Sequence, residues 1–159
     1  MGDENMTMFC RKITSTITDI EKVCRLYLQE EGLCLNELEY EKYISSAQKV
    51  YIKMLENGSY TYGCFDENEL LGVINVNKNW DYYPRYENNP YVHLETLIVS
   101  KKFQNNKIGT FLFENLMQLI KYEGVTYIIM QSDNEYVQKI AKKIGLNEHS
   151  YDMRIDYTI

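Results

Sequence analysis

The chain has 159 residues, of which 45% are hydrophobic, and a formal net charge of −6 from 17 basic and 23 acidic side chains. This length fits a single domain, residues 1–159, with enough apolar material for one sizeable core. The negative charge, with basic residues only in short groups such as Lys101-Lys102, disfavours a nucleic-acid partner.

Signals for membrane insertion, export and metal binding are missing from the sequence. There is no run of about 18 apolar residues, and the first residues lack a basic-then-apolar pattern. The cysteines, at positions 10, 24, 34 and 64, form no CxxC pair. We therefore expect a cytoplasmic protein with reduced thiols, no metal site and no membrane partner.

Four segments carry apolar residues at the spacing of one helical face, and a glycine follows the last apolar turn of each. Thr18 with Glu21 predicts a capping box for the first helix, and Asn36 with Glu39 suits the start of the second. The glycines can end these helices because glycine adopts positive φ at low cost. From cap to glycine, the predicted helices cover residues 18–32, 36–58, 108–124 and 134–145.

Strand patterns fill the gaps, at residues 8–14, 60–65, 70–76, 92–99, 125–130 and 151–159, and the part after Asn147 can divide in two. Residues 77–90 hold Trp80 and both prolines, and their aromatic content predicts an ordered loop and not a linker. The resulting order is β-α-α-β-β-β-α-β-α-β, which predicts an α+β (mixed α/β) fold in one domain.

The most informative stretch runs from His93 to Leu112, where an apolar strand enters a polar turn that opens a helix. The first-turn amides of such a helix lack intrahelical partners, and the helix dipole adds partial positive charge. This arrangement predicts an anion site, for which a diphosphate is the obvious ligand. Gly109 would let that ligand approach the backbone closely.

This stretch resembles the signature of the GCN5-related N-acetyltransferase (GNAT) superfamily. That signature is Gln or Arg, two residues, Gly, one residue, then Gly or Ala, after a strand that ends in Val. Here it reads Gln104 to Gly109 with Val99 upstream, and it departs at Lys107, where the family usually has Gly. Residues 131–134 and 139–146 are similar to the family's next strand and helix. The resemblance implies a central, mixed and mostly antiparallel sheet of six or seven strands flanked by four helices.

The resemblance also implies acetyl-CoA as co-substrate. The backbone of Leu97, Ile98 and Val99 would pair with the pantetheine arm where the strand separates from its neighbour at a bulge, and one amide would polarise the thioester carbonyl. Asn134 would meet the other side of the CoA. The side chain of Lys107 is expected to lie outward in solvent. The residues expected to hold the diphosphate or line its turn are Gln104, Asn105, Asn106, Lys107, Ile108, Gly109 and Thr110.

Glu95 is the first candidate for a general base, because a carboxylate in so apolar a strand needs a partner or a purpose. Similar acetyltransferases often carry Glu four residues before the Val of the signature. His93 lies on the same face if the strand is regular, and an imidazole also suits base catalysis, alone or with Glu95 through a water. The Tyr that usually protonates the leaving thiolate in this family aligns with Ala141, so the general acid stays unassigned.

These inferences predict an N-acetyltransferase that moves the acetyl group of acetyl-CoA to a primary amine of a small molecule or peptide by direct attack. The alternative is a CoA-binding sensor or partner protein that has lost the chemistry. The aromatic loop at 80–86 is the expected acceptor wall, with a plain packed loop as the open alternative. Acidic residues gathered between positions 30 and 41 fit a cationic amine or a solvated helix face. A homodimer is one open arrangement, since dimers are common among similar proteins.

Overall fold

The computed structural model describes residues 7–78, 91–104, 107–125, 127–131, 135–143, 145, 147–149 and 154–158. Within these ranges seven strands form one sheet in the order β1-β2-β3-β4-β5-β7-β6. The pair β4–β5 is parallel and the other neighbouring pairs are antiparallel. The strands are β1 (Met8–Lys12), β2 (Tyr60–Asp66), β3 (Glu69–Asn77), β4 (Tyr91–Val99), β5 (Tyr127–Gln131), β6 (Asn147–His149) and β7 (Arg154–Thr158).

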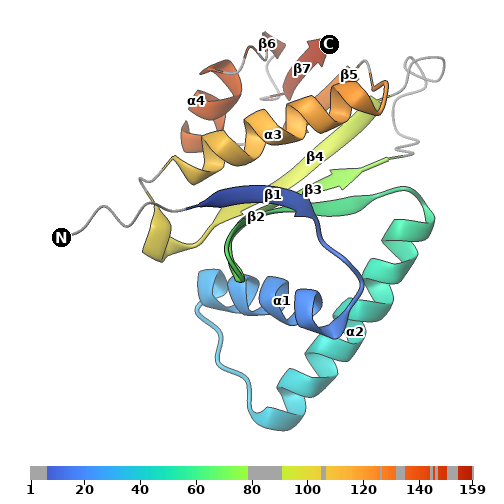
Figure 1. The fold of residues 1–159 in the computed structure, drawn as a ribbon, viewed down its shortest axis with the longest axis vertical. Coiled ribbons are helices and arrows are strands. Elements are labelled where there is room, and N and C mark those ends of the chain that lie inside the picture. The colour runs from blue at the N-terminus through green and yellow to red at the C-terminus, as the bar shows by residue number, and fades with distance from the viewer. Residues whose placement is uncertain are drawn as a thin grey trace.

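Two pairs of helices cover the two faces of this sheet (Figure 1). On one face lie α1 (Ile17–Glu31) and α2 (Glu37–Glu56), and on the other α3 (Ile108–Tyr122) and α4 (Glu135–Lys143). A short 3-10 helix, η2 (Lys101–Phe103), follows β4. The predicted fold class and element order are confirmed, including the division of the last segment into β6 and β7.

The sheet separates two hydrophobic cores. The core under α3 and α4 contains the fully buried Leu94, Leu112 and Phe113. The core under α1 and α2 contains Val73 and Ile98 from the sheet. Since alternate residues of a strand face opposite sides, β3 and β4 supply side chains to both cores. Both faces of these two strands are therefore covered, which explains their nearly continuous apolar sequences.

The helix ends follow local capping chemistry, with one correction to the sequence prediction. Asn36 and Glu39 form the predicted capping box at the start of α2, and Gly32 ends α1 with φ 66°. The N-cap of α1 is Thr16, whose side chain accepts a hydrogen bond from the amide of Asp19, so the prediction of Thr18 was wrong. Thr16 takes this role because its backbone is extended, whereas Thr18 already lies within the helix.

A β-bulge interrupts β4 at Thr96. Val73 of β3 pairs with Ile98, but Asn75 pairs with Glu95, so β4 has one residue more than β3 in this interval. Thr96 has φ 52°, a left-handed conformation that β-branched residues rarely adopt. The extra residue reverses which face the following side chains occupy. Leu94 before the bulge and Leu97 after it both belong to the core under α3 and α4.

Candidate functional site

The strands β4 and β5 pair along only part of their length. Their parallel register begins at Tyr91 with Tyr127 and, in the described residues, ends at Leu94 with Met130. From Glu95 to Val99, β4 keeps its pairing with β3 on the other side. The half of β4 beyond the bulge thus presents a strand edge toward the α4 side, and such an edge can pair with an extended ligand.

A cavity of about 360 Å³ lies along this edge. Leu97, Ile98 and Val99 of β4 line it, together with Gln104 of the following turn. Tyr136 and Val137 of α4 and Glu30 of α1 complete the lining. The structure therefore gathers four of the predicted site residues around one cleft between β4 and α4.

The turn that opens α3 leaves the helix without a side-chain cap from its first residue. Lys107 is the N-cap of α3, and its own side chain makes no cap hydrogen bond to the first-turn amides. Lys107 has φ 59°, which explains why the related signature usually has Gly at this position. Its side chain is exposed. Asn105, Asn106 and Asn134 lie outside the described residues, as does the whole aromatic loop at 80–86.

Gly109 has a different role from the one expected from the sequence. A Cβ at this position would lie 2.8 Å from Cδ1 of Ile140 and 3.0 Å from the hydroxyl of Tyr136. The glycine therefore allows α3 to pack closely against α4. The expectation that Gly109 leaves room chiefly for a ligand is corrected, because the neighbours are side chains of this chain.

Glu95 is held by two neighbours on the α1–α2 face of the sheet. Its Oε2 accepts a hydrogen bond of 2.7 Å from Nδ2 of Asn77, and its Oε1 lies 3.0 Å from Nδ1 of His93. The His93 side chain is 6% exposed and that of Glu95 is 36% exposed. The carboxylate is therefore the accessible member of the pair, and the imidazole lies behind it. The two residues share one face, as the sequence spacing predicted.

A second polar chain lies next to Glu95 on the same face. Asn75, which pairs with Glu95 across the strands, donates through Nδ2 to the hydroxyl of Tyr27 at 3.2 Å. Its Oδ1 accepts a 2.7 Å hydrogen bond from the Thr61 hydroxyl. Burial raises the pKa of Tyr27, and the charge of Glu95 adds to that rise while the bond from Asn75 opposes it. The phenol is therefore a neutral neighbour of the carboxylate at physiological pH.

The α4 helix supplies a tyrosine to the cleft, at a different position from the one suggested by the family pattern. Ala141 is fully buried in the core beneath α4, so this position does not face the cleft. Tyr136 lines the cleft and lies beside the first turn of α3. Sequence reasoning gave Tyr136 no weight, because a single tyrosine among 15 carries little signal.

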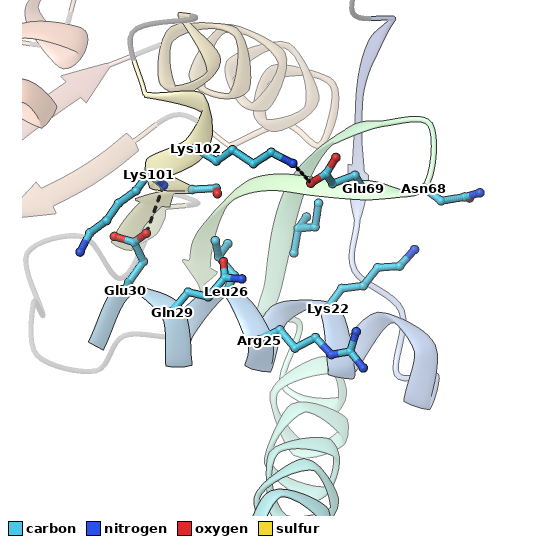
Figure 2. A pocket seen from close by; sticks show the side chains of 11 residues that line it. Lys22, Arg25, Leu26, Gln29, Glu30, Asn68, Glu69, Lys101 and Lys102 are labelled. Atoms are coloured by element: carbon cyan, nitrogen blue, oxygen red, sulfur yellow. Dashed lines mark hydrogen bonds and ion pairs between the residues drawn. The ribbon is translucent and has the colours of Figure 1, made fainter. Parts of the chain in front are cut away.

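A larger hollow of about 580 Å³ adjoins the cleft (Figure 2). Its cations are Lys22 and Arg25 of α1 and Lys101 and Lys102 of η2. Glu30 lines both cavities, and its Oε1 accepts from the Lys101 amide at 3.3 Å. The acids Glu30 and Glu69 line the same hollow, and Glu69 pairs with Lys102, so the four cations are partly balanced. Neither the cluster nor the place of Glu30 in the cleft follows from sequence spacing.

Comparison with known proteins identifies the family and the fold. The model of the acetyltransferase (GNAT) family matches residues 20–146. The chain belongs to this family. No curated protein sequence matches it significantly.

Solved structures of GNAT acetyltransferases share the whole fold at low sequence identity. The PaiA N-acetyltransferase of Thermoplasma acidophilum in complex with coenzyme A has a TM-score of 0.66 and 16% identity, covering 97% of this chain and 100% of its own. The Salmonella typhimurium enzyme that modifies the N-terminal serine of ribosomal protein L7/L12 has a TM-score of 0.69 and 16% identity, with coverages of 96% and 95%. Glucosamine-6-phosphate N-acetyltransferase of Arabidopsis thaliana has a TM-score of 0.67 and 15% identity, with coverages of 92% and 96%.

The family assignment gives this GNAT protein acetyl-CoA-dependent acetyl transfer as its chemistry. The cleft joins the β4 edge to Tyr136 of α4, which lies beside the first turn of α3. Among the described residues, no group of His, Cys, Asp or Glu could hold a metal ion, and no helix is long and apolar enough to cross a membrane.

Proposed function

We propose that this protein is an N-acetyltransferase that acetylates a primary amine with Glu95 as general base. The observation that carries the proposal is the position of Glu95 at the bulge. There β4 stops pairing with β5 and begins to line the cleft. A carboxylate at this point lies beside the place where a thioester laid along β4 would end.

In this mechanism the amine nitrogen attacks the thioester carbonyl carbon and forms the new C–N bond. Glu95 takes the proton that the nitrogen loses, directly or through a water. The C–S bond then breaks, and the CoA thiolate leaves and takes a proton from solvent, which balances the reaction. A backbone amide of β4 beyond the bulge would polarise the carbonyl, as an oxyanion donor does.

His93 and Asn77 act as positioning residues in this proposal. Each lies within hydrogen-bond distance of a different oxygen of Glu95, so together they fix the orientation of the carboxylate. His93 is the weaker candidate for the base, because its side chain is nearly inaccessible. For the cofactor, Leu97, Ile98 and Val99 would hold the pantetheine arm. Gln104 and the amides from Asn106 to Thr110 would hold the diphosphate, with Asn105 in the same turn and Asn134 opposite.

One observation favours the second candidate, a CoA-binding sensor without activity. The position at which the family usually has an acidic Tyr is Ala141, and it is buried in the core. The enzyme is favoured over the sensor for two reasons. A CoA thiolate is a tolerable leaving group without a general acid from the protein, and the Glu95 carboxylate lies at the bulge of β4, where the proposed base is needed.

Two measurements test the proposal. Thermal unfolding with acetyl-CoA should show stabilisation of about 2.7 kcal/mol at 100 times the dissociation constant. A screen of primary amines that detects released CoA thiol should find turnover above hydrolysis. Stabilisation without thiol release from any amine would support the sensor. A failure of acetyl-CoA to stabilise the protein would contradict both candidates.

A further inference from the structure

A second cavity lies on the face of the sheet that carries Glu95. It has a volume of about 350 Å³ and lies between α1 and α2, with β2 and β3 as its floor. Its lining from α1 includes Val23, Cys24 and Tyr27, and its lining from α2 includes Ala47 and Val50. This volume exceeds the roughly 150 Å³ that suffices for a benzene ring. The cavity can therefore hold an aromatic ring or a branched alkyl group.

The polar groups on the floor of this cavity are bonded within the protein. The Tyr51 hydroxyl donates to the carbonyl of Ile13 at 2.6 Å and accepts from the Thr61 amide at 3.1 Å. Asn75 is bonded to both Tyr27 and Thr61. No carboxylate and no cation is among its described lining residues. Apart from the hydroxyls of Tyr43 and Ser46, the lining offers few partners to a ligand with further charges or hydroxyls, whereas an apolar group is buried favourably against it.

The cavity adjoins the carboxylate proposed as base. Asn75 belongs to its lining and is the cross-strand partner of Glu95. Residues paired in this way have Cβ atoms about 4.5–5.5 Å apart, and their side chains share a face. Tyr27 lines the same end of the cavity and is close enough to Glu95 for its pKa to respond to the charge. An acceptor in this cavity would therefore have its polar end near the base.

We propose that the acceptor is a primary amine attached to an apolar or aromatic group, and that this group occupies the cavity between α1 and α2 while the amine meets Glu95. This inference rests on the proposed acetyl transfer and specifies its substrate class. It disfavours polyamines, aminoglycosides and sugar amines, because each brings several additional polar groups into a mostly apolar lining that offers them few partners. The acidic residues of α2 do not favour a polycationic acceptor in this cavity. Glu39 is engaged in the capping box, and Glu37 and Glu41 are exposed.

The test uses three probe amines with the full chain and acetyl-CoA. They are 2-phenylethylamine, ethylamine as the same amine without the ring, and spermidine as a polar, multiply charged amine. The expected result is a kcat/KM for 2-phenylethylamine at least about tenfold above that for ethylamine, because a buried hydrophobic group discriminates on this scale. An equal or higher value for ethylamine or spermidine would overturn the inference while leaving acetyl transfer intact.

A matched pair of variants tests whether the preference for 2-phenylethylamine arises in the cavity. Ala47→Phe adds a ring to the cavity wall, and Ser45→Phe adds the same ring to an exposed position of α2 that does not line it. We expect Ala47→Phe to lower kcat/KM for 2-phenylethylamine at least about tenfold and to leave ethylamine unchanged. Ser45→Phe should change neither. An equal loss for both amines in Ala47→Phe would contradict occupancy of the cavity, provided that acetyl-CoA still stabilises the variant.

A binding measurement tests occupancy of the cavity independently of acetyl transfer. Chemical-shift changes on addition of 2-phenylethylamine to the protein without acetyl-CoA should fall on the cavity residues and should be lost in Ala47→Phe. Binding of this kind without turnover of any amine would sustain the cavity and refute the acetyl transfer. Shifts elsewhere, or none, would overturn the inference even if other amines are acetylated.

Discussion

Glu95 and Ile98 face the same pair of helices although three positions separate them in one strand. In a regular strand this spacing would put them on opposite faces. Thr96, in its left-handed conformation, is the extra residue of the bulge. Because of it, the side chains of Glu95 and Ile98 lie on the same face of the sheet. The bulge therefore returns Ile98 to the face of Glu95, toward α1 and α2, while the backbone beyond it turns an edge toward the cleft.

Thr96→Gly tests whether the bulge stores backbone strain. A β-branched residue at φ 52° costs about 1 kcal/mol or more relative to glycine, so we expect the variant to gain about 1 kcal/mol of unfolding free energy in urea. The control is Thr110→Gly in α3, where glycine should cost about 0.3 kcal/mol, because Thr is itself a weak helix former. A loss of stability in Thr96→Gly would mean that the Thr96 side chain makes contacts that outweigh the strain.

Glu95→Gln tests the base. It keeps the size of the side chain and removes the proton acceptor, so we expect turnover to fall about 10²-fold or more with little change in acetyl-CoA affinity. The acid limb of the pH–rate profile should move or disappear. His93→Ala should have a smaller effect, because the imidazole acts through Glu95. Full activity of Glu95→Gln with loss in His93→Ala would transfer the role of base to His93.

Lys107→Gly restores the residue usual in the family signature. Because Lys107 has φ 59° and no cap bond, glycine should stabilise the turn by about 0.5–1 kcal/mol. We expect acetyl-CoA affinity, measured by calorimetry at two salt concentrations, to change less than about tenfold, because the exposed Lys107 side chain points outward and the backbone amides would carry most of the binding. A phosphate contact worth about 1.5–3 kcal/mol would instead give a loss of more than about tenfold. A larger loss of acetyl-CoA affinity, with a flatter salt dependence, would show that the Lys107 ammonium group binds phosphate.

Gly109→Ala should destabilise the protein before any ligand binds. The new Cβ would meet Cδ1 of Ile140 at 2.8 Å, and overpacking of this kind costs about 1–3 kcal/mol. Ile140→Val removes that methyl and should restore part of the loss in the double variant, as seen in thermal unfolding. Strict additivity of the two changes would show that the strain lies elsewhere, in the Tyr136 hydroxyl or the backbone.

Asp19 ties β1 to α1 and should make stability depend on acid pH. It accepts two hydrogen bonds from Arg11, at 2.7 and 2.9 Å, and others from the amide and hydroxyl of Thr14. The bonds from Arg11 are the main reason that the pKa of this buried carboxyl lies far below its usual value. A lowered folded pKa gives stability that is complete above the unfolded pKa of about 3.9 and is lost as the pH falls toward the folded value.

Asp19→Asn should therefore cost about 2 kcal/mol at pH 7 and flatten the loss of stability below about pH 5. Urea unfolding across this pH range measures both effects. Glu69→Gln is the matched control, because the ion pair of Glu69 with Lys102 is exposed and 3.5 Å long, and it should change stability by less than about 1 kcal/mol. If Asp19→Asn loses stability below about pH 5 just as the unmodified protein does, other carboxylates cause that loss.

The sequence by itself determined where the helices and strands lie and to which protein family the signature belongs. Helical spacing, cap residues and glycines act within a few residues, so they predicted α1 to α4 almost to their ends. The signature from Gln104 to Gly109 is equally local, since its amides belong to one turn. Thr16 was missed as a cap because Thr18 competes for the same role, and only the backbone conformation separates the two.

Tertiary structure decided which residues meet across the fold. The pairing of Asn75 with Glu95 depends on the register of β3 against β4, and a one-residue bulge sets that register. The meeting of Gly109 with Ile140 depends on how α3 packs against α4. The same is true of the cavity between α1 and α2, which joins residues from four elements. These contacts arise from the packing of separate segments, and no spacing within one segment encodes them.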